Sequence, residues 1–242
     1  VVYSEDLARF SRPLYEYRDV WRASGHMDGL VGDFRFTNAR LFFGKESRAF
    51  GTVAFRGLPE FETSTMDFSL NNAVATGPDL EQYVGKNTMA SIATFFPVRF
   101  GATFLGRYND FKTKGIFETP LGHAEPDLTM KLATKTASST YDGTLKLVDF
   151  ELGKLLGDEK LIQRVDLSGR VAGRGFALDD AVLLFDGTVP RLGIRGYDYR
   201  RAVVHGTLQR GLFDGEVSLR DTNLVFDLAG RVDLRQRRDA FD

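Results

Sequence analysis

Apolar and polar side chains alternate along most of this chain. In the segments 66–70, 128–132, 213–219 and 224–228, apolar residues occupy every second position. A period of two places successive side chains on opposite faces of a β-strand. The pattern therefore predicts about fifteen short strands, and the connections of a few residues between them are typical of an antiparallel meander.

Charged residues commonly occupy the intervening positions of these strands, so the predicted sheet has one apolar face and one wet face. Examples are Arg35, Asp67, Lys131, Lys146, Arg220 and Asp227. A sheet of this many strands has to close, pack on itself or curl. We expect a long curved antiparallel sheet that forms a U-shaped hydrophobic groove, although a β-sandwich would show the same alternation.

Short helical turns interrupt the strand pattern at near-regular intervals. Leu7, Leu80 and Leu152 each lie in such a segment, and they stand 73 and 72 residues apart. Glycine-centred strand pairs follow around Gly25, Gly101 and Gly169, and mid-strand glycines suit bends. Internal repeats indicate stacked units that share a continuous apolar face. The chain is thus interpreted as one continuous β-repeat segment with units at 1–75, 76–148 and 149–242.

Local signals refine the strand boundaries. The alternation across Thr37–Ala39 indicates a bulge, and Gly44–Ser47 and Thr119–Gly122 indicate turns. Asn71-Asn72 is expected to close the strand that precedes it. A Gly-Thr-aliphatic triplet is expected to start a strand, and it occurs at Gly51, Gly143, Gly187 and Gly206.

Phenylalanine is unusually frequent, with 21 residues among 242. A Phe ring has no polar group, so this number indicates a large apolar surface, either a core or a surface for a ligand. The expected lining of the groove follows from the alternation, and one register slip would reverse it. The lining residues are Phe34, Phe36, Phe55, Phe68, Phe100, Phe104, Met130, Leu147, Val171, Val217, Phe226 and Leu228.

No catalytic or metal-binding constellation is visible. The chain has no cysteine, and the isolated His26, His123 and His205 have no second ligand at a metal-binding spacing. Asp33 and Asp110 take matched positions after glycines, which fits turn capping better than the acid pair of a glycosidase. The chain is therefore expected to be non-enzymatic, with no cofactor and no metal.

Several other classes of function find no support. Glycine-rich stretches at 29–32 and 169–175 lack the following helix and Lys-Ser/Thr of a phosphate loop. The net charge is −1 and the basic run at 235–238 is interpreted as a solvated tail, so no nucleic-acid partner is expected. No apolar run approaches the roughly 20 residues of a membrane helix.

Several motifs resemble a known family. They include Gly51–Pro59, Gly106–Phe111, Phe150–Gly157 and Leu224–Gly230. Together they make nearly the whole chain similar to the TamB branch of the AsmA-like proteins, in the form found in Bacteroidetes-type bacteria. The resemblance implies the middle fragment of a longer protein whose repeats form a U-shaped sheet, the β-taco. It carries no catalytic residues.

The resemblance implies that the protein forms a bridge across the periplasm, between the inner and outer membranes. The family is attached to the inner membrane by an N-terminal anchor absent from this chain. It is implicated in moving phospholipids towards the outer membrane and in outer-membrane biogenesis, with a barrel partner of the TamA type. The first hypothesis is therefore a groove that carries phospholipid. The alternatives are a structural or chaperone module for barrel assembly and a sugar-acting enzyme, of which the latter lacks its acid pair.

Overall fold

The chain adopts an all-β fold, as its sequence predicts. The structure, a computed structural model, describes residues 2–3, 20–30, 32–133, 138–175 and 181–233. The described strands are antiparallel and follow one another in sequence order, and a few short helices connect them. Two compact units are present, unit 1 (Val1–Asp127) and unit 2 (Leu128–Asp242). The three sequence repeats remain a prediction.

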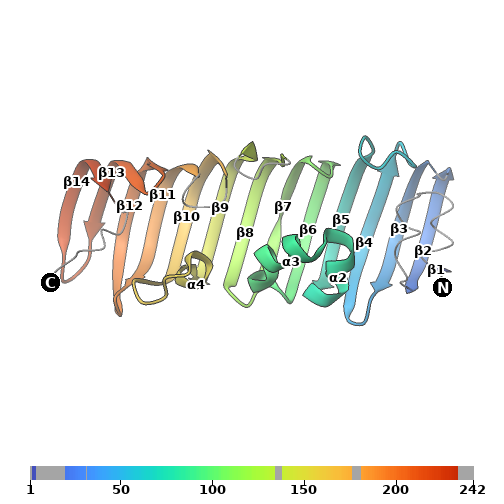
Figure 1. Cartoon of the computed structure of the whole chain (residues 1–242), viewed down its shortest axis with the longest axis horizontal. Coiled ribbons are helices and arrows are strands. Elements are labelled where there is room, and N and C mark those ends of the chain that lie inside the picture. Colours follow the sequence, from blue (N-terminus) through green and yellow to red (C-terminus); the bar gives the residue numbers. More distant parts are fainter. Residues whose placement is uncertain (1, 4–19, 31, 134–137, 176–180, 234–242) are drawn as a thin grey trace. The chain divides into compact units, whose positions relative to one another are not determined.

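Unit 1 is a meander with a helical insertion (Figure 1). In its described part the strands are β1 (Val2–Tyr3), β2 (Val20–Leu30), β3 (Asp33–Phe43), β4 (Ser47–Arg56), β5 (Thr65–Ala75), β6 (Val98–Arg107) and β7 (Asp110–Thr119). The insertion between β5 and β6 contains α2 (Gly77–Val84), α3 (Lys86–Ile92) and the short helix η2 (Ala93–Phe95). The next strand, β8 (Gly122–Lys131), contains the boundary between the units.

Unit 2 repeats the same plan, and its strands β9 to β12 are longer than those of unit 1. Its described strands after β8 are β9 (Thr140–Glu151), β10 (Ile162–Arg174), β11 (Val182–Ile194), β12 (Tyr197–Gln209), β13 (Leu212–Arg220) and β14 (Val225–Asp233). The helix α4 (Leu152–Leu156) connects β9 to β10 and ends at Gly157, which is left-handed with a φ of 74°. The expected helical turns at 79–85 and 151–157 are both confirmed, whereas the one at 6–10 lies outside the described residues.

The strand registers separate the apolar and polar faces of each unit. In unit 1, Phe34 pairs with Phe55 and Phe68 with Phe104, whereas Arg35 pairs with Ala54 and Ala54 with Asp67. Residues that are directly opposite share a face. The face that carries the first set is called the apolar face of unit 1, and the other is its polar face. The polar face presents the Arg35–Asp67 ion pair, at 2.9 Å.

A β-bulge shifts the side-chain alternation by one residue, so a strand of ten residues or more can keep its apolar side chains on the same face of the sheet. In β3 the register shifts between Phe36 and Ala39, where Asn38 has a φ of 50°, so the predicted bulge is confirmed. The predicted strand end at Asn71-Asn72 is wrong. Asn72 has a φ of 53°, which Asn tolerates better than most residues, and β5 continues through a register shift to Ala75.

The Gly-Thr-aliphatic triplets do not start strands, contrary to the prediction. Gly51, Gly143, Gly187 and Gly206 all lie inside strands. Close approach between neighbouring backbones accounts for Gly51 and Gly187. A Cβ on Gly187, for example, would lie 2.4 Å from the Ser168 carbonyl oxygen and 2.6 Å from the Gly169 Cα. Such contacts occur where sheets bend tightly, so the triplet marks a position within a strand where a side chain fits poorly.

The helical insertion of unit 1 covers one end of the apolar face. Asp79 of α2 contacts Ser47 at the start of β4, and the Trp21 indole N–H donates to the Tyr83 hydroxyl at 3.0 Å. Trp21 also stacks on Phe43, with ring centroids 4.9 Å apart. This end of the sheet is where β3 turns into β4. Within the described ranges, no helix combines the length and the hydropathy that a membrane span requires.

Candidate apolar binding face

The six phenylalanines predicted to line a groove in unit 1 all lie on its apolar face. Direct pairs join Phe34 to Phe55, Phe68 to Phe104 and Phe100 to Phe117, and Phe36 pairs with Val53, which in turn pairs with Phe68. Phe36 is buried and the other five predicted residues are half-buried. The alternation of the sequence therefore places all six on one side of the sheet.

Five of the rings on this face form a continuous row, here named the phenylalanine ladder. It consists of Phe34, Phe55, Phe68, Phe104 and Phe111, one from each of the strands β3 to β7. Their successive ring centroids are 5.6, 5.2, 5.8 and 4.4 Å apart. These are ordinary contact distances for aromatic pairs. Four strand spacings of about 4.8 Å give the ladder a length of roughly 19 Å.

The ladder lies away from the helical insertion. Phe34, Phe55 and Phe104 are near the turns that join β2 to β3, β4 to β5 and β6 to β7, whereas α2 contacts the turn at the other end of β3 and β4. Stacked Phe61 and Tyr108, with centroids 5.8 Å apart, lie in two of the turns at the ladder end. The described strands of unit 1 supply no second layer over the ladder, because they follow one another side by side.

Phe111 and Phe117 belong to this face although the prediction did not include them. The pairs Gly106–Phe111 and Phe100–Phe117 place both rings beside the predicted ones. The available signal was the two-residue turn at 108–109. A hairpin with such a turn pairs residues symmetrically about it, so the face of Gly106 continues to Phe111.

Five of the six predicted residues of unit 2 also share a face, namely Leu147, Val171, Val217, Phe226 and Leu228. Register joins Leu147 to Leu167, Val217 to Leu228 and Val171 to Phe185. Leu147 and Val171 are buried, Val217 and Leu228 are half-buried, and Phe226 is 37% exposed. Met130 is half-buried in β8. This face also carries Gly169, Gly187, Gly206 and Gly215, so it presents backbone where unit 1 presents rings.

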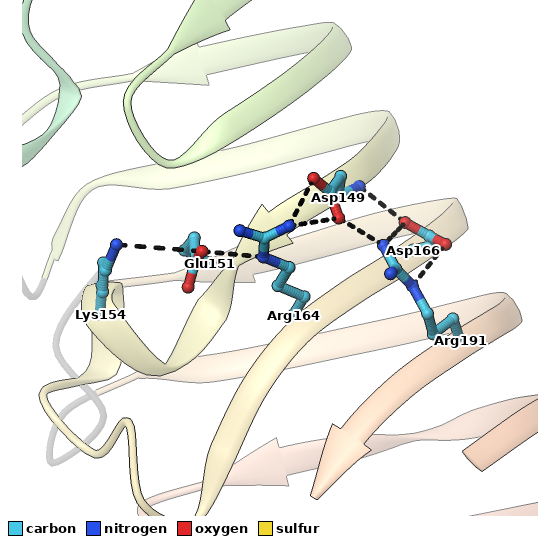
Figure 2. A network of polar contacts seen from close by, with 6 residues as sticks. All are labelled: Asp149, Glu151, Lys154, Arg164, Asp166 and Arg191. Carbon is cyan, nitrogen blue, oxygen red and sulfur yellow. Dashed lines mark hydrogen bonds and ion pairs between the residues drawn. The ribbon is translucent and has the colours of Figure 1, made fainter. Parts of the chain in front are cut away.

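Ion pairs cover the polar face of unit 2. Figure 2 shows Arg164 between Glu151 and Asp149, and Arg191 between Asp149 and Asp166. The Asp149 backbone N–H also donates to Asp166 at 2.6 Å. Asp149 has a φ of 50° and lies at the β9 bulge. The hydrogen bond from Arg191 is the main cause of the lowered pKa of Asp149. The network thus holds the bulge, and its acids are engaged by arginines.

The histidines are engaged by carboxylates on the strand surface. His26 contacts Asp28, His205 contacts Asp186, and His123 contacts Glu118 and Glu125 at 2.6 and 2.9 Å. The hydrogen bonds to these two carboxylates raise the pKa of His123. Across the described ranges, no group of three or more His, Cys, Asp or Glu side chains is arranged to hold a metal ion.

Asp33 and Asp110 are equivalent turn residues. Each is the first residue of its strand after a two-residue connection, and each pairs with the last residue of the preceding strand, Leu30 or Arg107. Both side chains are exposed. Both residues lie beside turns, and capping of these turns by their side chains remains a prediction.

The apolar face of unit 1 therefore presents a continuous row of half-buried rings, and the ion network of unit 2 stabilises the bulge in β9. A comparison of the chain with family models, with curated proteins and with solved structures yields no match.

Proposed function

We propose that this chain is a non-enzymatic module that carries phospholipids, with their acyl chains held against the apolar face of the sheet. The phenylalanine ladder is the observation that carries the proposal. It offers a continuous apolar track across five strands, and the helical insertion lies at the other end of the same face. The similarity of the motifs to TamB-like proteins supports a periplasmic location, an inner-membrane attachment outside this chain and a barrel partner of the TamA type.

The chemistry of such a track is passive. Each methylene removed from water contributes about 0.8 kcal/mol, so about ten methylenes on the ladder would contribute roughly 8 kcal/mol before ordering costs. The rings have no polar group that would select one headgroup over another. Headgroups would remain in water while acyl chains move along the face, and no nucleotide or catalytic residue is needed.

The test compares a ladder variant with a neighbour on the opposite face. Phe104 lies in the ladder, whereas Leu105 is 54% exposed on the polar face of the same strand. The purified chain, Phe104→Arg and Leu105→Arg are analysed by native mass spectrometry and lipid extraction. We expect phospholipid on the wild type and on Leu105→Arg, and a severalfold loss on Phe104→Arg.

Circular dichroism separates loss of lipid from loss of the sheet. A Phe104→Arg chain that keeps its β-spectrum and its phospholipid would contradict the proposal. A folded wild type that purifies without phospholipid, and takes up none from vesicles of phosphatidylethanolamine and phosphatidylglycerol, would also contradict it. In that case the phenylalanine ladder would serve as a packing surface.

A further inference from the structure

A cleft of about 650 Å³ lies in unit 1 beside the turn that joins β3 to β4. Its lining includes Arg22, Lys45, Arg48 and Arg99, and Glu46 is the single carboxylate among the described lining residues. Four cationic side chains around one cleft stand out in a chain whose net charge is −1. The volume is within the range of small-molecule sites, which is about 300–1,000 Å³.

The strand register explains how three arginines that are distant in sequence meet. Direct pairs run from Arg22 to Phe42, from Phe42 to Arg48, from Arg48 to Val74 and from Val74 to Arg99. These five residues form one row across β2 to β6, on the polar face. The arginines alternate with apolar residues, so neighbouring arginines are two strand spacings apart, or about 10 Å.

The four cations have no partner in the described part of the chain. No hydrogen bond or ion pair joins the side chain of Arg22, Lys45, Arg48 or Arg99 to another described residue. Glu118, the register partner of Arg99, instead contacts His123. Elsewhere on the polar faces, arginines such as Arg35, Arg164 and Arg191 are paired with carboxylates. The cleft therefore concentrates positive charge that the described residues leave unneutralised.

The walls of the cleft are partly apolar and its turn is firmly held. Phe42 and Val74 lie between the arginines, and Pro97 lines the same space. The turn at 44–46 is fixed because the Asp79 carboxylate accepts hydrogen bonds from the backbone N–H groups of Lys45 and Glu46, at 2.8 and 3.0 Å. The cations are thus presented by paired strands and by a turn bound to α2.

We propose that this cleft is a binding site for a phosphate group carried on a small organic molecule. A phosphate has three acceptor oxygens and a charge near −2, so several guanidinium groups can bind it at once. Arginine is suited to this role because its planar fork donates two parallel hydrogen bonds. Phe42, Val74 and Pro97 would contact the organic part. The site faces away from the ladder and does not depend on lipid carriage.

The test measures binding by isothermal titration calorimetry with phenyl phosphate as the probe and inorganic phosphate as its simpler counterpart. Arg48→Met removes the central guanidinium. Arg56→Met is the matched control, because Arg56 lies on the same face of the same strand but outside the cleft lining. We expect phenyl phosphate to bind the wild type and the control, and Arg48→Met to weaken binding roughly tenfold to a hundredfold.

Further measurements identify the source of the phosphate, and a second variant is used if the first does not fold. The chain is also pelleted with phosphatidylglycerol vesicles. If both pelleting and the binding of phenyl phosphate depend on Arg48, the site takes phosphate esters in general, including those of lipid headgroups. Arg99→Met, an exposed position, replaces Arg48→Met if the latter fails to fold. Absence of phenyl phosphate binding to the folded wild type, or equal weakening by Arg56→Met, would overturn the proposal. Loss of lipid in Phe104→Arg with unchanged phosphate binding is the expected sign that the two sites are separate.

Discussion

Replacement of Asp79 by Asn should destabilise the chain far more than its conservative chemistry suggests. Asp79 is 6% exposed, and one of its oxygens accepts from the Lys45 backbone N–H. The other accepts from the backbone N–H groups of Glu46 and Ser47 and from the Ser47 hydroxyl, at 3.0, 2.8 and 2.8 Å. One carboxylate thus binds a whole turn to α2.

The magnitude follows from these contacts. The best orientation of the substituted asparagine side chain keeps its oxygen where three donors converge, and its NH₂ group then faces the Lys45 N–H, which is left without an acceptor. Loss of that bond costs about 1–3 kcal/mol, and each remaining bond weakens because its acceptor is no longer charged. We expect Asp79→Asn to lower the free energy of unfolding by about 3 kcal/mol, a large part of a typical domain's stability.

Urea unfolding followed by tryptophan fluorescence is the direct assay. Trp21 is the only tryptophan, and its indole donates to Tyr83 of the same helix as Asp79. Asp33→Asn is the control, because Asp33 is exposed, and a surface change of this kind is usually within about 0.5 kcal/mol of wild type. If Asp79→Asn also stays within that margin, the turn is not held by this carboxylate and the reasoning is refuted.

The pH dependence gives a second check of the same residue. Burial by itself would raise the pKa of Asp79, but hydrogen bonds from Lys45, Glu46, Ser47 and Thr76 outweigh burial and lower it well below its usual range. The unfolded chain therefore takes up the proton first, and stability present above a pH of about 3.9 is lost as the pH falls. Between about pH 6 and about pH 3, the wild type should lose about 1 kcal/mol more than Asp79→Asn.

Three further predictions follow from the polar network, the histidines and the glycines. Arg191→Met removes both hydrogen bonds to Asp166, and it should cost about 1 kcal/mol in urea unfolding at low salt and less at high salt. His123 should titrate in NMR spectra with a pKa above the usual histidine value of 6.5. Its contribution to stability is then complete below pH 6.5 and is lost as the pH rises through the higher pKa of the folded state. A titration midpoint at or below 6.5 would contradict this prediction. Gly169→Ala places a Cβ 2.4 Å from a carbonyl oxygen and should cost about 2 kcal/mol, whereas Gly101→Ala, with its nearest contact at 3.6 Å, should be close to neutral in the same urea experiments.

The faces of the strands could be predicted from sequence because burial follows a period of two between the bulges. Phe68 and Phe104 are 36 residues apart. Phe68 alternates with Asp67 and Ser69, and Phe104 shares the parity of Phe100 and Ala102, so both are assigned to the apolar side without knowledge of any pairing. The ring contact between them, at 5.8 Å, agrees with the register of β5 and β6. The prediction misses Phe111, because its face follows only from the pairing of Gly106 with Phe111 across the two-residue turn at 108–109.

Bulges show where local sequence is insufficient. Asn38 and Asn72 both adopt a positive φ and both lie at register shifts, but only the first is predicted as a bulge. Asn is equally suited to ending a strand and to bending one. What decides at Asn72 is the pairing of Ala73 with Phe100 and of Ala75 with Val98, which continues the sheet beyond the bulge.

The ion network and the cation-lined cleft could not be predicted, because they depend on inter-strand register. Arg191 and Asp149 are 42 residues apart and their contact requires two intervening strand pairings to be known. The same is true of Arg22, Arg48 and Arg99. A charged residue in an alternating pattern indicates a wet face, and only the register states which charges become neighbours.

The meander has a consequence for how each unit folds and opens. Because the described strands pair with their neighbours in the chain, ordering a hairpin such as β3–β4 or β11–β12 requires only a short loop to close, and growth can start at several places. The same connectivity means that the described strands form their backbone hydrogen bonds with strands that are adjacent in the sequence. Opening should spread strand by strand, so the middle strands of unit 1, β4 and β5, should be among the last regions of that unit to exchange their amide protons with solvent.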